Sequence, residues 1–217
     1  MSIAASLVVT RAAFIAFALS VAGSFAMVPT ASAADAIAQL KAFSESTRSA
    51  RGEFSQQQLR ESRQAAPPSR GEFAFSRPGR FRWDIRTPYQ QLIVTDGRRL
   101  YFYDKDLKQV TVRQAGDVIR ATPAAVLFGG GDLEAAFKLT DLGTRDGLDW
   151  VEAVPKQPDS GFDRIVVGLR DGLPAEMEVK DAFGQTNRFL FTRISRNAPV
   201  PDAEFAFTPP AGVDVVE

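Results

Sequence analysis

The spacing of hydrophobic and polar residues predicts one short helix followed by a long series of β-strands. Over residues 35–47 the apolar side chains of Ile37, Leu40 and Phe43 recur every three residues, which is typical of one face of an amphipathic helix. From Gly52 onward the period changes to two, as in half-buried antiparallel strands. The chain therefore begins its ordered part with a helix and continues as a β protein.

Alternation is clearest where large apolar side chains occupy every second position. Examples are Phe73 with Phe75, Phe81 with Trp83, and Leu100 with Phe102. Turn-forming pairs such as Pro78-Gly79 and Asp96-Gly97 separate these runs. We expect roughly ten or eleven strands with no internal repeat and no linker, which predicts one large curved sheet or barrel in a single domain.

The alternation breaks between Ala115 and Lys138, where a second helical segment is expected. Thr122 before Pro123 is typical of a helix start. An apolar stretch follows and ends at a glycine triplet, after which Asp132 can cap another short helix through Phe137. Residues 122–137 are therefore predicted to form a helical flap over the sheet.

The first 33 residues have the features of a cleaved leader. Arg11 is the only charged residue before Asp35, residues 12–28 are apolar, and Ala31-Ser32-Ala33 fits a signal-peptidase site. A permanent membrane anchor is the alternative, but Pro29 and the short apolar run disfavour it. We expect residues 1–33 to be a signal peptide cleaved after Ala33, of a bacterial type, which makes the mature chain periplasmic or secreted.

Charge and composition exclude several classes of function. The chain has 26 Lys+Arg and 26 Asp+Glu, so no basic surface for nucleic acid or an anionic membrane is indicated. It has 0 Cys and 0 His, which excludes thiol nucleophiles, zinc ribbons and histidine-based triads. Gly129-Gly130-Gly131 lacks the Lys-Ser/Thr of a phosphate loop. An enzyme is not excluded, but its chemistry would have to use carboxylates, Lys or Tyr alone; we expect the chain not to be one and to need no metal or cofactor.

The aromatic strands and the helical segments can be interpreted in two ways. They can form an ordinary sandwich core, or they can line an apolar cavity that the helices cover, as a binder of hydrophobic ligands requires. In the second interpretation the sheet and the two helical segments share the lining. The predicted cavity residues are Ile37, Leu40, Phe75, Phe81, Trp83, Leu100, Phe102, Val126, Leu127 and Phe128.

Arg77 is the polar residue that we single out, because it lies between two aromatic strands. The guanidinium carries five N–H donors in a fixed fork, so at a cavity mouth it could bond the unpaired carbonyls at a helix end. The alternative is a surface arginine before a turn.

Six short segments occur in an order and spacing that suggest a family. They are Phe54-Ser55-Gln56, Arg77-Pro78-Gly79-Arg80-Phe81-Arg82-Trp83, Val94-Thr95-Asp96-Gly97, Leu100-Tyr101-Phe102-Tyr103, Thr122-Pro123 and Phe205-Ala206-Phe207-Thr208-Pro209-Pro210-Ala211-Gly212-Val213. Together they resemble the LolA-type outer-membrane lipoprotein carriers of Gram-negative periplasms, and the resemblance covers residues 35–217.

The resemblance implies a mainly β fold: a single incomplete, unclosed antiparallel β-barrel of about eleven strands with a short α-helical lid. Residues 34–217 would be the single lipoprotein-carrier domain, with lid helices at about 35–47 and 122–137. The resemblance also gives Arg77 the role of bonding the lid backbone and holding the empty carrier shut. The chain departs from the family at Gly129-Gly130-Gly131, which looks looser than the usual polar stretch.

The implied partners are acylated lipoproteins, an inner-membrane ABC-type lipoprotein-releasing complex and an outer-membrane lipoprotein receptor. The carrier would bind the acyl chains of lipoproteins released from the inner membrane and deliver them to that receptor; we expect it to be a monomer. Two other hypotheses are a periplasmic sensor of mislocalised lipids or lipoproteins with the same fold, and a lipid-modifying hydrolase that uses carboxylates.

Overall fold

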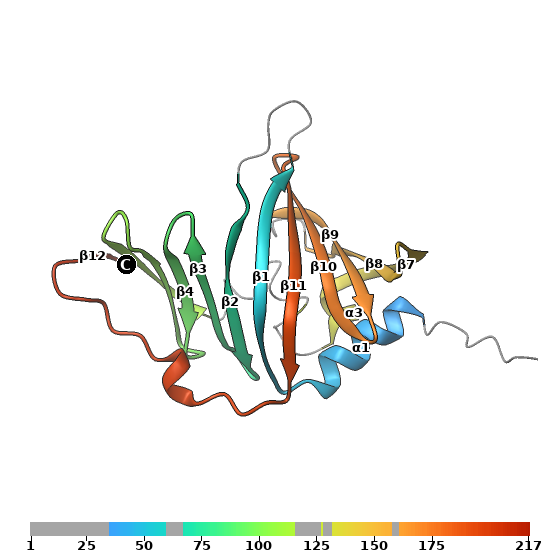
Figure 1. Ribbon diagram of the computed structural model, residues 1–217, viewed down its shortest axis with the longest axis horizontal. Coiled ribbons are helices and arrows are strands. Elements are labelled where there is room, and N and C mark those ends of the chain that lie inside the picture. Colours follow the sequence, from blue (N-terminus) through green and yellow to red (C-terminus); the bar gives the residue numbers. More distant parts are fainter. Residues whose placement is uncertain (1–34, 60–66, 116–126, 128–131, 158–160) are drawn as a thin grey trace, which may run out of the picture. The chain divides into compact units, whose positions relative to one another are not determined.

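Twelve strands form one unclosed sheet in the computed structural model, which describes residues 35–59, 67–115, 127, 132–157 and 161–217. The strand order is β12-β6-β5-β4-β3-β2-β1-β11-β10-β9-β8-β7, with β12 and β7 at the two edges (Figure 1). Neighbouring strands are antiparallel except β12 and β6. The predicted mainly β fold with an unclosed sheet and short helices is confirmed.

The helices and strands have the following bounds: α1 Ala36–Ser46, β1 Ser49–Leu59, β2 Ser69–Ser76, β3 Arg80–Thr87, β4 Gln91–Thr95, β5 Arg99–Asp104, β6 Gln109–Gln114, α3 Leu133–Ala136, β7 Phe137–Arg145, β8 Leu148–Pro155, β9 Phe162–Arg170, β10 Leu173–Asp181, β11 Thr186–Arg196, the 3₁₀ helix η2 Asp202–Phe205 and β12 Asp214–Val216. The expected strand number was about eleven, and β12 is the additional strand. It is parallel to β6, because the residue pairs advance in the same direction along both strands, from Asp214 with Gln109 to Val216 with Thr111.

The strand register separates an inner from an outer face. Directly paired residues of antiparallel strands point to the same side, so Phe73, Trp83, Ile93 and Phe102 form one row across β2, β3, β4 and β5. We call the side that carries this row the inner face. The residues between them in sequence, such as Arg82 and Asp84, point to the outer face.

Helix α1 packs on the inner face over strands β7, β8, β9 and β10. The carboxylate of Asp35 caps it by accepting a hydrogen bond from the N–H of Ile37 at 2.9 Å. Leu40 and Phe43 from its apolar stripe are buried in the same core cluster as the inner-face residues. Sequence periodicity thus predicted both the helix and the side that it buries.

The second helical segment is described only from Asp132 onward and at Leu127. Asp132 caps α3 by accepting hydrogen bonds from the N–H groups of Glu134 and Ala135. The helix ends one residue earlier than expected, because Phe137 is extended and starts β7. Thr122-Pro123, Gly129-Gly130-Gly131 and the leader of residues 1–33 lie outside the described residues.

The C-terminal segment covers part of the outer face. After β11 the chain runs past the ends of β1, β2 and β3 to η2 and then to β12 (Figure 1). The ring of Phe207 lies 5.2 Å from that of Tyr101 and 5.6 Å from that of Tyr103. Phe205 is 1% exposed, with the Arg80 guanidinium 5.7 Å from its ring centroid. Outer-face apolar residues of β5 are therefore shielded by this segment.

None of the helices in the described part of the chain is long and apolar enough to cross a membrane.

Candidate functional site

The centre of the inner face is an aromatic cluster around Trp83. The Trp83 ring stacks on Phe54 with centroids 3.7 Å apart and an interplanar angle of 23°. Four further rings lie with their centroids 5.9–6.4 Å from Trp83: Phe73, Phe81, Phe189 and Phe191. Strands β1, β2, β3 and β11 each contribute rings to this cluster.

The structure brings most of the predicted cavity residues to this surface. Leu40, Phe75, Trp83 and Leu127 belong to one buried cluster, and Ile37 and Phe81 pack against it. Leu100 and Phe102 share the face by register but stand outside that cluster. Val126 and Phe128 lie outside the described residues.

Side chains fill the described space between α1 and the sheet. Leu40 and Phe75 are 0% exposed, Leu127 is 1% exposed, and Trp83 is 7% exposed. The predicted residues therefore pack against one another in this closed arrangement. We call α1 together with Leu127 the cover. A ligand that uses this surface must displace part of the cover before it can reach the aromatic rings.

Sequence reasoning missed several residues of the aromatic cluster. Phe54 and Phe73 were visible as alternating strand residues, and Phe189 and Phe191 flank Leu190 in the same pattern. Their place beside Trp83 depends on the pairing of β11 with β1, which joins Phe191 to Phe54. Alternation in the sequence indicated that these side chains point inward, but it did not show which strand lies next to which.

Arg77 follows β2 and joins two separate pieces of the cover. Its backbone N–H donates to the carbonyl of Arg48 at 2.8 Å, which fixes the base of the side chain. One terminal nitrogen, Nη1, donates to the carbonyl of Thr47, the residue that ends α1. The other, Nη2, donates to the carbonyl of Leu127 at 2.8 Å. The guanidinium therefore ties the end of α1 to the segment that contains Leu127.

The guanidinium of Arg77 is held without an acidic partner among the described residues. It lies 4.9 Å from the centroid of the Phe75 ring and 5.9 Å from that of Phe43. Burial lowers the pKa of Arg77 from its ordinary value to about 10, so the side chain remains charged at neutral pH. Its charge is compensated by carbonyl dipoles and ring faces, which favours a contact that can be broken more readily than a buried ion pair.

Two polar atoms at this contact have no hydrogen-bond partner in the described structure. They are Nε of Arg77 and the hydroxyl oxygen of Thr47. Thr47 is 1% exposed, so water does not reach its hydroxyl in this arrangement.

The opposite end of α1 is fixed by carboxylates. Asp141 accepts a hydrogen bond from the N–H of Ala36 at 3.0 Å, and Asp149 accepts one from the side chain of Gln39 at 2.6 Å. Hydrogen bonds from Thr144 and Gln39 lower the pKa of Asp149. The side-chain oxygen of Gln39, Oε1, accepts a hydrogen bond from the N–H of Gly172 at 3.2 Å. The start of α1 is thus bonded to β7, β8 and the β9–β10 turn, whereas Arg77 bonds its end.

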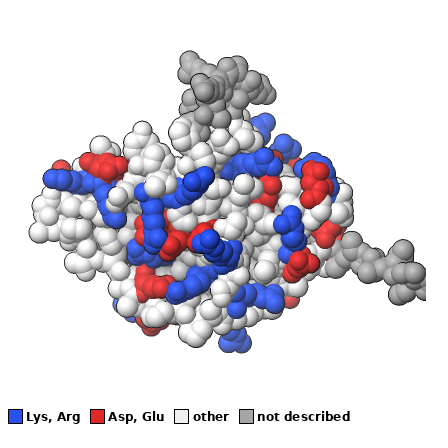
Figure 2. All heavy atoms as spheres, in the orientation of Figure 1, with Lys and Arg blue, Asp and Glu red and all other residues white. Residues whose placement is uncertain are grey.

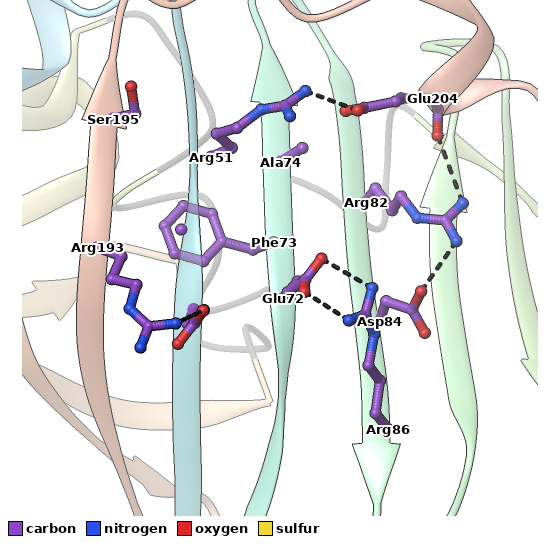
Figure 3. Close-up of a pocket in the computed structure, with 12 residues that line it drawn as sticks. Arg51, Glu72, Phe73, Ala74, Arg82, Asp84, Arg86, Arg193, Ser195 and Glu204 are labelled. Carbon is purple, nitrogen blue, oxygen red and sulfur yellow. Dashed lines mark hydrogen bonds and ion pairs between the residues drawn. The ribbon is translucent and has the colours of Figure 1, made fainter.

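A hollow of about 470 Å³ opens on the outer face, away from the predicted site (Figure 3). Four arginines and four acidic residues line it, and each arginine is paired. Figure 3 shows Arg51 directed at Glu204 and Arg86 at Glu72, at 2.6 and 2.8 Å. Charges of both signs continue over this face in Figure 2. The hollow carries no net charge and is lined by ion pairs, so it does not resemble a lipid site.

The described residues contain no group of three or more acidic side chains placed to hold a metal ion.

Comparison with known proteins assigns the chain to a family. The family model described as outer membrane lipoprotein carrier protein LolA matches residues 45–208. An outer-membrane lipoprotein carrier protein of Bordetella avium is 45% identical over 200 residues, covering 92% of this chain and 96% of that protein. The protein of the same name from Bordetella pertussis is 48% identical, covering 85% and 88%.

Among solved structures, an uncharacterized conserved protein from Thermus thermophilus shares the fold. It has a TM-score of 0.54 at 10% identity and covers 83% of this chain and 98% of its own. The family match spans most of the chain, and the sequence relatives are covered over nearly their full length. This chain belongs to the LolA family of outer membrane lipoprotein carrier proteins.

Proposed function

We propose that this chain is a periplasmic carrier that binds the acyl chains of lipoproteins released from the inner membrane and delivers them to the outer membrane. The observation that carries the proposal is an apolar inner face closed by a cover that Arg77 bonds in two places. Relatives at 45% and 48% identity are named outer-membrane lipoprotein carrier proteins, and the predicted leader of residues 1–33 supports the periplasmic location.

Binding would proceed by opening the cover and exposing the aromatic cluster. Alkyl chains would then replace contacts that Leu40 and Leu127 make with the sheet in the closed form. No covalent chemistry is required, because apolar burial supplies the affinity. The chain would act as a binding protein rather than an enzyme.

The free energy needed to open the cover makes release of the acylated cargo possible. Each buried methylene contributes about 0.8 kcal/mol, so three fully buried acyl chains would contribute on the order of 30 kcal/mol. Non-covalent affinity saturates near 20 kcal/mol, and cargo held that tightly would not be delivered. Breaking the Arg77 bonds and uncovering the aromatic rings offsets part of this gain, which keeps loading and unloading both accessible.

The proposed partners follow from the route. An inner-membrane ABC-type complex would supply the acylated lipoprotein, and an outer-membrane lipoprotein receptor would accept it, with the carrier acting as a monomer. The sensor hypothesis is not favoured, because the relatives that cover most of this chain are named carriers.

The test is uptake of a synthetic lipopeptide by the mature chain, measured by native mass spectrometry. We expect a 1:1 complex with the acylated peptide and none with the same peptide lacking its acyl chain. Phe81→Glu places a charge in the inner face and should abolish the complex. Tyr89→Glu, at a residue that is 68% exposed, is the matched control and should bind normally. Equal uptake by both variants would refute the inner face as the site.

A further inference from the structure

The contact between Arg77 and the end of α1 contains two buried polar atoms that nothing in the described structure satisfies. Buried polar groups are nearly always hydrogen-bonded, because leaving one unpaired costs the free energy of its desolvation. Here two occur together, on the two residues that the Arg77–Thr47 bond joins. A pair of such atoms at one contact indicates a place where something else binds.

The chemistry of the two atoms defines what could satisfy both. Nε of Arg77 carries one N–H and can only donate, while the Thr47 hydroxyl can donate one hydrogen bond. Both remaining donors therefore match an acceptor oxygen. An ammonium or other pure donor would leave Nε unpaired.

The surroundings restrict the acceptor further. Phe43 and Phe75 flank the guanidinium, and the carbonyl of Leu127 already occupies Nη2. Among the described residues the guanidinium contacts two aromatic rings, and both of its hydrogen-bond partners are carbonyl oxygens. A ligand carbonyl attached to an alkyl chain fits both features, with its oxygen at the donors and its chain along the rings.

We propose that the Thr47 hydroxyl and Nε of Arg77 form a subsite for the ester or amide carbonyl that links an acyl chain to its lipoprotein. This inference rests on the proposed carrier function. When the Arg77–Leu127 bond opens, the carbonyl of the cargo accepts from Nε of Arg77 and from the Thr47 hydroxyl, so the guanidinium gains one acceptor as it loses the Leu127 carbonyl. The site selects acyl chains over plain alkyl chains and sets the depth to which a chain enters.

The test compares three probes that share one peptide and one hexadecyl-length chain. In the first the chain is attached through an ester, in the second through an amide, and in the third through an ether, which has no carbonyl. Dissociation constants are measured from the fluorescence of Trp83 in a Trp150→Phe background, so that one tryptophan on the inner face reports binding. We expect at least one carbonyl probe to bind about fivefold tighter than the ether probe, the change in Kd typical of one hydrogen bond.

Two variants at position 47 distinguish this role from a structural one. Thr47→Val keeps the shape and removes the hydroxyl, and it should reduce the ratio of the affinity for the carbonyl probe to the affinity for the ether probe. Thr47→Ser keeps the hydroxyl and should retain the preference. Thr47→Val should also melt no lower than the parent chain, because it removes an unpaired buried hydroxyl.

The carbonyl subsite and the carrier function can fail independently in this test. Equal affinity of the parent chain for all three probes overturns the carbonyl subsite, with no need for any variant, and leaves the carrier function standing. If Thr47→Val prefers the carbonyl probe as strongly as the parent chain does, the Thr47 hydroxyl has no role in the subsite. If the parent chain binds none of the probes, the proposed function itself fails.

Discussion

Replacing Arg77 by leucine tests whether its two hydrogen bonds keep the cover closed. The change removes the donors to the carbonyls of Thr47 and Leu127 and leaves an apolar side chain of similar width next to Phe75. In the closed form both carbonyls then lack this partner, whereas opening lets water reach them. The open form should therefore gain population.

The size of the effect follows from the contacts. Hydrogen bonds with a charged partner contribute about 1.5–3 kcal/mol each, so the two bonds together contribute about 3–6 kcal/mol. Burial of the guanidinium, visible in its pKa of about 10, opposes this. Because the residue is only partly buried, we discount this opposing cost and take a net closing contribution of about 2 kcal/mol, which corresponds to about a 30-fold change in the opening equilibrium.

Amide hydrogen exchange measures that opening directly. In Arg77→Leu the amides at the end of α1, including Thr47, should exchange about 30-fold faster than in the parent chain. Amides of β9 and β10 serve as the internal control and should be unaffected. Arg77→Lys keeps the charge but cannot bond two carbonyls with one planar fork, so it should give an intermediate rate. Unchanged exchange at the end of α1 in Arg77→Leu would refute the role assigned to Arg77.

Three further predictions concern the framework around the site. Gly71→Ala should lower the free energy of unfolding by about 3 kcal/mol in urea titration, because a Cβ there would lie 2.0 Å from the backbone oxygen of Asp84; a loss under about 0.5 kcal/mol would contradict the close packing of β2 on β3. Phe205→Ala should cost about 3–5 kcal/mol, whereas Phe183→Ala, at a residue that is 88% exposed, should change stability by less than about 0.5 kcal/mol; similar losses for both would argue against the packing of the C-terminal segment. The pKa of Asp149 in the folded chain lies below the ordinary 3.8. Ionised Asp149 therefore stabilises the start of α1 at pH values above 3.8, and this stabilisation is lost as the pH falls through the lowered pKa. Asp149→Asn should remove this part of the acid dependence of α1 exchange, and an identical acid profile in parent and variant would disprove the link.

Local patterns predicted the elements because they depend on neighbouring residues. The three-residue spacing of Ile37, Leu40 and Phe43 indicated α1, and the capping residue Asp132 marked the start of α3. Alternation at Phe81 and Trp83 placed both side chains on one face of β3. The helix end at Ala136 and the extra strand β12 escaped prediction, because burial of Phe137 and pairing with β6 decide them and neither is local.

By itself, the sequence determined that the chain is a β protein with one amphipathic helix, an aromatic face and an unusual arginine at the end of β2. Only the tertiary structure decided which groups these residues contact. Pairing of β11 with β1 brings Phe189 and Phe191 to Trp83 from a strand far along the chain. The partners of Arg77 are backbone carbonyls, which every residue possesses, so no pattern of side chains can identify them. Their position depends on where the fold places the end of α1 and Leu127.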